Sequence, residues 1–156
     1  MSVPVGLTLP RNGHNGRVIS TALAADLRDA GLAWTPVSGD AFQLAGIDFE
    51  GDVFTVSDMT IEAHVYPSGT ILGFNGTTEW ALDSVALEDA LWLPREDQLR
   101  DALAGTFVDL TRELGTDERA SYTVTTMVDG QEARAVSEDP AEAYGLALLA
   151  LLRSLA

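Results

Sequence analysis

The sequence predicts a single small α+β domain, in which an antiparallel β-meander packs against an N-terminal helix, a middle helix and a very apolar C-terminal helix. Apolar residues recur at helical spacing near both ends of the chain and at every second position between them. Asn75-Gly76 and Asp129-Gly130 are typical of tight hairpins, because both central residues of a type I′ turn need positive φ. The length of 156 residues lies within the usual range of one domain.

The N-terminal part divides into an arm and a helix. Residues 1–16 are expected to form an extended arm or loop, and residues 17–156 the α+β domain, because glycine and asparagine are frequent at the end of the first stretch. A helix is predicted from Arg17 to Ala30, where isoleucine and leucine recur every four residues. Gly31 suits the position that follows a helix end, since glycine readily adopts positive φ.

The apolar period then changes from 3.6 to 2, which predicts short antiparallel strands joined by turns. Residues 33–82 are therefore expected to form a meander of hairpins, followed by one helical turn at Ser84–Ala90. The predicted strands of this meander are 33–35, 41–45, 53–56, 60–66, 70–74 and 79–82.

The remaining elements are a helix, a hairpin region and a last helix. Pro94 suits a first helical position, Arg95–Ala104 is predicted to be helical, and Gly105 ends it. Three strands are then expected, the last two of them joined by Asp129-Gly130: 106–114, 122–128 and 131–136. Asp139 is a good N-cap for the last helix, with Pro140 at its first position and Glu142 three residues after the cap.

The last helix is unusually apolar. From Ala143 to Leu152 every residue other than Gly145 is Ala, Leu or Tyr, and a helix that is apolar all round must be covered on more than one side. At about 17 residues it is ~25 Å long, shorter than a bilayer core of ~30 Å, and it contains Arg153. It is therefore expected either at the centre of the core or shared with a second copy, and we expect a homodimer through this helix.

Composition excludes several classes of chemistry. The chain has no cysteine, which excludes disulfides, thiolate nucleophiles and cysteine-ligated metals. It has no lysine either, which excludes a P-loop and a lysine Schiff base. Its 24 carboxylates against nine arginines give a formal charge of −15, which disfavours nucleic acid and anionic membranes and favours basic partners. With neither a signal peptide nor a membrane span predicted, we expect a cytoplasmic protein with no cofactor and no metal.

The strand predicted at 60–66 carries one candidate polar site. Glu62 and His64 are two residues apart, so their side chains share one face about 7 Å apart along the strand. They are suited to a base with its carboxylate or to two metal ligands, and Asp58 or Glu79 would have to supply a third group. The other interpretation is a solvated sheet face, which antiparallel sheets normally have.

Aromatic residues suggest a second candidate surface. Trp80 follows the turn at Asn75, and Trp92 precedes Pro94. The tryptophans either fill the core between sheet and helices or line a groove beside that turn, because aromatic side chains dominate binding sites. The candidate binding surface consists of Asp58, Glu62, His64, Asn75, Glu79, Trp80 and Trp92.

Four segments are characteristic: LRDAGLAW at 27–34, SDMTIE at 57–62, FNGTTEWALDS at 74–84 and LWLPREDQLR at 91–100. In these the chain resembles a small actinobacterial family whose members have no characterised function and some of which carry the label pilus-assembly protein. The resemblance covers roughly residues 19–104 and implies no catalytic residue. The label implies a P-loop ATPase, whose essential lysine this chain lacks. The order of elements is also similar to that of type III secretion chaperones, which implies a small dimeric protein that binds another protein.

Three functional hypotheses follow. The first is a non-enzymatic protein-binding module, chaperone-like or adaptor-like, which is favoured by the apolar last helix and the acidic surface. The second is an immunity-type or inhibitor-type protein for a basic partner, whose binding should weaken with salt. The third is a small-molecule enzyme that uses the face of Glu62 and His64.

Overall fold

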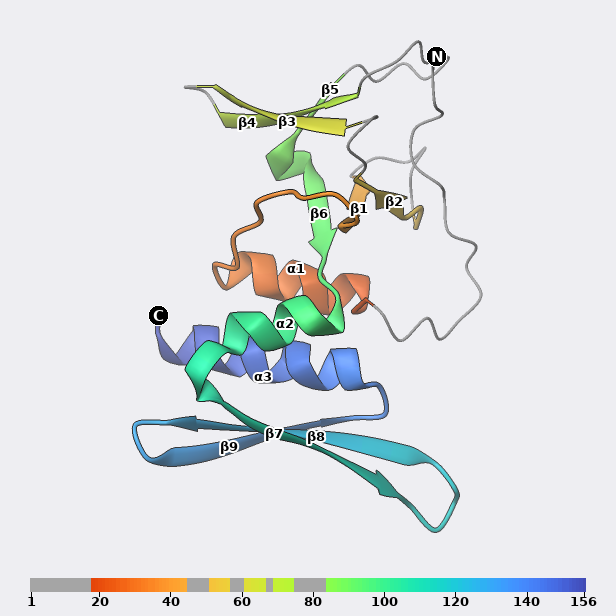
Figure 1. The fold of residues 1–156 in the computed structure, drawn as a ribbon, viewed down its shortest axis with the longest axis vertical. Helices are drawn as coiled ribbons and strands as arrows, with labels where there is room; N and C mark the ends of the chain where they lie inside the picture. The colour runs from red at the N-terminus through yellow and green to blue at the C-terminus, as the bar shows by residue number, and fades with distance from the viewer. Residues whose placement is uncertain (1–17, 45–50, 57–60, 67–68, 75–83) are drawn as a thin grey trace. The chain divides into compact units, whose positions relative to one another are not determined.

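The computed structural model describes two compact units, one within residues 34–93 and the other within residues 18–33 and 94–156 (Figure 1). Helices and antiparallel sheets occur together, which confirms the α+β class and the three predicted helices. The expected arm at 1–16 lies outside the described residues, and the single domain over 17–156 stays a prediction. The described residues are 18–44, 51–56, 61–66, 69–74 and 84–156, and within 61–86 they are described by their backbone alone.

The first unit, residues 34–93, contains two three-stranded antiparallel sheets. In one sheet β1 lies between β2 and β6, and Phe42 is opposite both Phe54 and Trp92. In the other, β3, β4 and β5 follow one another as a meander. The strands are β1 (Ala41–Leu44), β2 (Phe54–Thr55), β3 (Ile61–Tyr66), β4 (Gly69–Phe74), β5 (Ser84–Ala86) and β6 (Ala90–Leu93), with a 3₁₀ turn, η2 (Leu87–Asp89), before the last.

Three sequence-based assignments in this unit need correction. Residues 33–35 form no strand, because the ring of Trp34 is held in a loop by a side-chain hydrogen bond. Ser84–Ala90 is not a single helical turn, since its first three residues pair with β4 and only Leu87–Asp89 is 3₁₀. β6 was not predicted, because a continuous apolar run has no period of two. The strand predicted at 79–82 lies outside the described residues.

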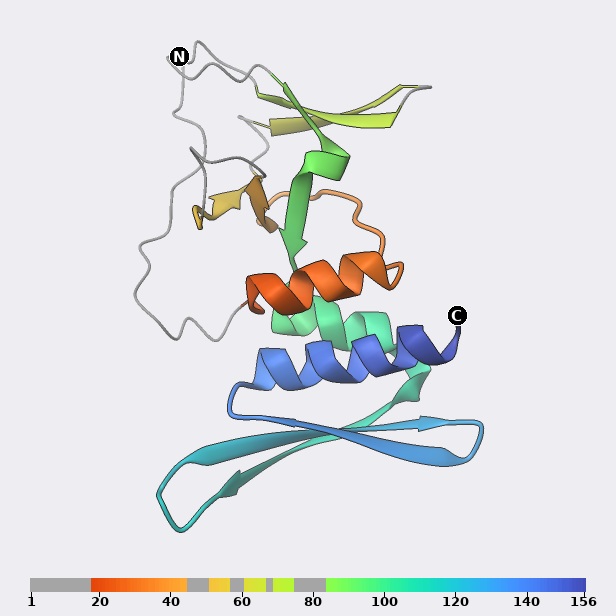
Figure 2. The same cartoon turned by 180° about the vertical axis from the view of Figure 1, so that it is seen from behind.

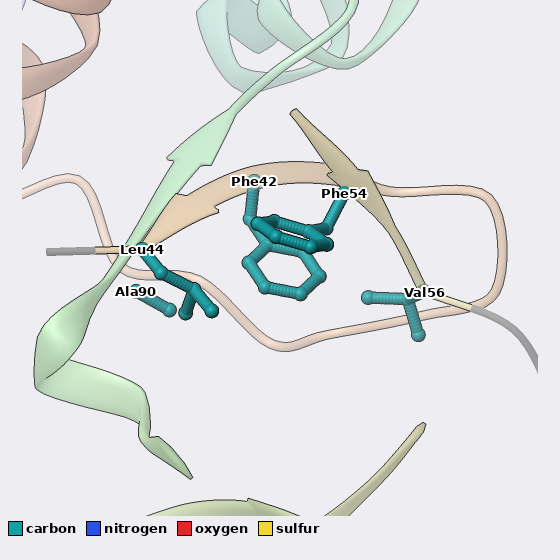
Figure 3. Close-up of a cluster of buried hydrophobic side chains, with 5 residues drawn as sticks. All are labelled: Phe42, Leu44, Phe54, Val56 and Ala90. Carbon is teal, nitrogen blue, oxygen red and sulfur yellow. The ribbon is translucent and has the colours of Figure 1, made fainter. Parts of the chain in front are cut away.

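The core of the first unit is a cluster of buried side chains from β1, β2, the residue after β2, and β6. The rings of Phe42 and Phe54 stack with centroids 5.7 Å apart, and Trp34 and Leu87 pack against the cluster. Figure 3 shows the clustered side chains, which are Phe42, Leu44, Phe54, Val56 and Ala90.

The second unit, which we call the helical unit, combines three helices with one sheet. β8 is the central strand of the sheet and pairs antiparallel with β7 and β9. Helix α3 lies on this sheet, in contact with β8 and β9, and both α1 and α2 pack on α3 (Figures 1 and 2). The elements are α1 (Thr21–Asp29), α2 (Glu96–Leu103), η3 (Ala104–Thr106), β7 (Phe107–Leu114), β8 (Ala120–Val128), β9 (Gln131–Ser137) and α3 (Pro140–Ser154).

The local signals at helix and hairpin ends are largely confirmed. Gly31 has φ +107° and follows the end of α1 in a Schellman arrangement, with hydrogen bonds from Gly31 N to Arg28 O and from Leu32 N to Leu27 O. Asp139 caps α3 by accepting from the next two backbone N–H groups, at 2.7 and 3.2 Å.

The turn between β8 and β9 and the start of α2 were also predicted from the sequence. Asp129 and Gly130 both have positive φ, as a type I′ turn requires. The start of α2 needs a small correction, because Arg95 is its N-cap and Pro94 precedes the helix.

Most of the apolar circumference of α3 is covered within the chain. The sheet covers one side, and α1 and α2 cover two others. Gly145 allows the closest approach, because a Cβ atom built there would lie 2.6 Å from Leu23 Cδ2. The helix lies at the centre of the core of this unit, as one of the two expectations had it, and cover by a second copy stays a prediction. None of the helices in the described part of the chain has the length and apolarity that a membrane crossing needs.

Candidate functional site

The structure describes only part of the predicted binding surface. Glu62 and His64 lie on β3, opposite Gly73 and Ile71 of β4, and their positions two residues apart place them on one face of the strand. Trp92 lies on β6. The other four predicted residues lie outside the described residues: Asp58, Asn75, Glu79 and Trp80.

The enzyme hypothesis depends on residues around Glu62 and His64. Among the side chains that the structure describes, no three histidine, aspartate or glutamate residues gather into a group that could hold a metal ion. The use of this face in catalysis stays a prediction.

Trp92 belongs to an aromatic group in the first unit. Its ring stacks nearly parallel on Trp34, with 6.2 Å between centroids and 7° between planes. Its Nε1 atom is buried and has no hydrogen-bond partner among the residues that the structure describes. Both rings are half-buried, so the pair combines packing on the Phe42 cluster with a partly open surface.

Asp40 organises the loop that carries Trp34. Its side chain is 1% exposed, and its Oδ2 accepts from Trp34 Nε1 at 2.9 Å and from Val37 N at 3.1 Å. Its backbone continues the sheet, because Val56 N donates to Asp40 O at 2.8 Å. These bonds give a buried carboxylate a structural task, which is to hold the tryptophan against β1.

The helical unit offers a more open surface on its sheet. Phe107 and Val124 are on the side of the helices, because the ring of Phe107 contacts Tyr144 of α3 and Val124 is fully buried. Side chains alternate along a strand, so the odd-numbered residues of β8 point to the opposite side, which we call the outer face. A row of three β-branched residues crosses its middle, with Thr111, Thr123 and Val136 in register on β7, β8 and β9.

The outer face is open at its edges and acidic in charge. Val136 is 58% exposed and Met127 is 40% exposed. By register, the charged residues on this face are three carboxylates and one arginine: Asp109, Glu113, Glu132 and Arg134. The arginine already pairs with Glu132 at 2.8 Å, whereas no ion pair is present for the other two carboxylates among the described residues.

The helical unit also contains a hollow, which is less suited to binding than the outer face. It has a volume of about 400 Å³, lies at the C-terminal ends of α1 and α3, and is wide open. Its charged groups are two carboxylates and one arginine, with no buried polar group directed into it. The lining residues are Asp26, Asp29, Ala30, Leu152, Arg153 and Ala156.

Comparisons with known proteins assign no family to this chain. No protein-family model, curated protein or solved structure matches this chain.

The outer face was missed in the sequence, although two signals for it were present. A two-residue turn at Asp129-Gly130 determines the register of β8 and β9 and therefore places Thr123 opposite Val136. Charged residues alternate with alanines along β9, from Glu132 to Ala135, which is typical of a strand with one face in solvent. These signals do not indicate which of the two faces of the sheet the helices cover.

Proposed function

We propose that this chain is a non-enzymatic protein-binding module, chaperone-like or adaptor-like, and that it binds its partner on the outer face of β7–β8–β9. The observation that carries the proposal is this regular sheet face, whose middle row of Thr111, Thr123 and Val136 has no helix or strand over it within the helical unit. Val136 and Met127 are apolar side chains exposed on this face among polar ones, and exposed apolar groups with a polar rim are typical of protein-binding sites.

The partner that fits this face carries basic residues next to apolar ones. Asp109 and Glu113 flank Thr111 on β7, and Glu132 lies further along the same face on β9. The whole chain carries a formal charge of −15. Complementary charge raises the association rate and selects the partner, while apolar contact in the middle supplies affinity. An inhibitor of a basic protein is the second candidate function, and it is favoured by the same net charge.

A synthetic peptide that alternates valine and arginine is the probe for this proposal. Its valines can contact the middle row while its arginines reach the carboxylates, so we expect binding that weakens as salt is added. The same peptide with glutamate in place of arginine should not bind. Fluorescence anisotropy of the labelled peptides measures both.

Two exposed valines provide a matched pair of variants. Val136→Arg places a positive charge on the outer face and should abolish binding of the basic peptide, because it removes an apolar contact and adds repulsion. Val37→Arg makes the same change in the first unit, at a side chain that is 53% exposed, and should leave binding unchanged. Equal affinity of the two variants would contradict the proposal, as would binding of the glutamate peptide.

Two earlier expectations continue as proposals beside this one. Membership in the small actinobacterial family is supported by the four segments quoted above. A homodimer through the C-terminal helix is supported by the part of α3 that its own chain leaves exposed, Leu146 and Ala150.

A further inference from the structure

Helix α3 retains one uncovered stripe. Leu146 is 38% exposed, and Ala150, one turn later, is also exposed, although the residues between them, 147–149, are buried. An apolar stripe on an otherwise buried helix indicates a side where neither the sheet nor another helix of the same chain packs.

The stripe lies on the side of the sheet edge formed by β9. Tyr144 points toward the opposite edge, because its ring packs on that of Phe107 of β7, with the two ring centroids 5.6 Å apart. Successive residues of a helix are rotated by about 100°, so Leu146 is about 200° and Ala150 about 240° from Tyr144. These two side chains therefore point away from β7 and toward the edge of β9.

Helix α3 also runs back along β9. It begins where β9 ends and returns over the sheet (Figure 1). The helix rise puts Leu146 about 9 Å and Ala150 about 15 Å beyond Pro140, which corresponds to about three and five residues of strand. The stripe is thus level with the middle of β9, where Ala133 is exposed on the helix side.

Strand β9 is itself an open edge. It pairs with β8 on one side, without a bulge from Gln131 to Ser137, and no described strand lies on the other side. β7, the opposite edge, is interrupted by a register shift between Phe107 and Asp109. A regular edge with unpaired N–H and C=O groups is the kind that accepts a further strand.

The charges of β9 are self-complementary. Glu132 and Arg134 flank Ala133, and both lie on the outer face. If two copies of β9 pair antiparallel about Ala133, Glu132 lies opposite the partner's Arg134, and Arg134 lies opposite the partner's Glu132. The small side chain of Ala133 meets its own copy on the helix side, below the two stripes of Leu146 and Ala150.

We infer that this surface binds a second copy of the chain: β9 pairs antiparallel with β9 of the partner about Ala133, and the stripe of Leu146 and Ala150 meets its equivalent. The two sheets then form one six-stranded sheet, and the outer face becomes continuous across the junction. This inference specifies the proposed dimer through α3, and it is independent of the peptide-binding role of the outer face.

Charge reversal tests the pairing at residues that are exposed. Glu132→Arg places arginines opposite each other across the junction, and Arg134→Glu does the same with carboxylates, so each should raise the dissociation constant of the dimer by about tenfold or more. The double variant E132R/R134E restores opposite charges and should dimerise like the natural chain. An equimolar mixture of E132R with R134E should form heterodimers, because each carries the charges that the other lacks.

Sedimentation velocity over a range of protein concentrations measures these equilibria. Physiological ionic strength is suitable, because a Debye length of about 8 Å screens the repulsion between two acidic copies but not charges in contact. Glu113→Arg, the same reversal on the edge strand β7, is the matched control and should leave the dimer unchanged. Far-UV circular dichroism shows that each variant is folded.

The outcomes separate this inference from the proposed function. A natural chain that is monomeric at every concentration overturns the inference, and so does a dimer that E132R and R134E leave intact or that E113R disrupts. In each case binding of the valine–arginine peptide can still be measured on the outer face, so the proposed function stands or fails by itself.

Discussion

Replacing Gly145 by alanine tests how closely α1 packs on α3. Alanine favours a helix over glycine by about 1 kcal/mol, so on propensity alone the variant should be more stable. The structure opposes this gain, because the new methyl group would lie 2.6 Å from Leu23 Cδ2 and 3.4 Å from Ile19 Cγ2. Leu23 is buried in this contact and has little room to move. Overpacking of a core costs about 1–3 kcal/mol, so we expect a net loss of about 1 kcal/mol in the free energy of unfolding.

A second substitution reverses the sign of this effect. Leu23→Ala alone should destabilise the helical unit by about 2–5 kcal/mol, because it leaves a cavity beside Gly145. In that background Gly145→Ala places its methyl group into the cavity and should stabilise the protein by about 1 kcal/mol. The coupling between the two changes is then about 2 kcal/mol, within the range measured for residues in contact. Ala102→Gly, at an exposed position of α2 outside every proposed interface, calibrates the propensity term alone.

Urea denaturation, monitored by two spectroscopic probes, shows which of the two units loses stability. All three tryptophans belong to residues 34–93, so tryptophan fluorescence reports on the first unit. The α-helices in the described part of the chain all belong to the helical unit, so far-UV circular dichroism reports chiefly on that one. The reasoning is refuted if Gly145→Ala raises stability in the natural background by the amount that Ala102→Gly removes, since α1 would then not pack closely against Gly145.

Three further predictions concern single contacts. Asp40→Ala leaves two donors without their acceptor in a buried site and should lower the stability of the first unit by about 2–4 kcal/mol, seen as an earlier tryptophan fluorescence transition. Glu142→Ala removes the carboxylate that accepts from Ser20, the N-cap of α1, and should lower the free energy of unfolding by about 1–2 kcal/mol, measured by circular dichroism. Glu138→Ala is its control: it removes an exposed ion pair of 3.6 Å and should change stability by less than about 0.5 kcal/mol. Burial raises the pKa of the Tyr144 phenol, an effect that Arg100 opposes. The folded state therefore holds this proton more tightly, so stability should fall as pH rises above about 10, and Tyr144→Phe should reduce that fall.

The helical unit is the part that local sequence signals described best. Asp139, Pro140 and Gly31 act through neighbouring backbone groups, so their roles can be inferred without the tertiary structure. The apolar run of α3 indicated a helix covered on several sides, but it did not distinguish cover by the same chain from cover by a second one. That distinction depends on Gly145 meeting Leu23, a contact between segments about 120 residues apart.

Non-local pairing is what sequence reasoning missed in the first unit. β6 pairs with β1 across more than 40 residues, and the Ala90–Leu93 run has no turn beside it that would indicate this partner. The role of Asp40 was missed for a related reason, since an aspartate after Ser38-Gly39 is also typical of an ordinary turn. Only its contact with Trp34 shows that it belongs to the core.

The proposed binding surface lies in the helical unit, whereas the residues singled out in the sequence lie in the first unit, where their role stays a prediction. The sequence directed attention to His64 and the tryptophans, because rare residue types attract a functional interpretation. The outer face consists of threonine, valine and ordinary charged residues, which become a surface only when register aligns them across three strands. This face is open because the helices cover the opposite side of the sheet, and that arrangement depends on tertiary packing.

The most direct test of this account is a two-dimensional amide NMR titration of the chain with the valine–arginine peptide. The account predicts shift changes centred on Thr111, Thr123 and Val136, with little change in α1 or in the first unit. Shift changes centred on residues 34–93 or on the helices, or none at a peptide concentration at which anisotropy shows binding, would contradict it.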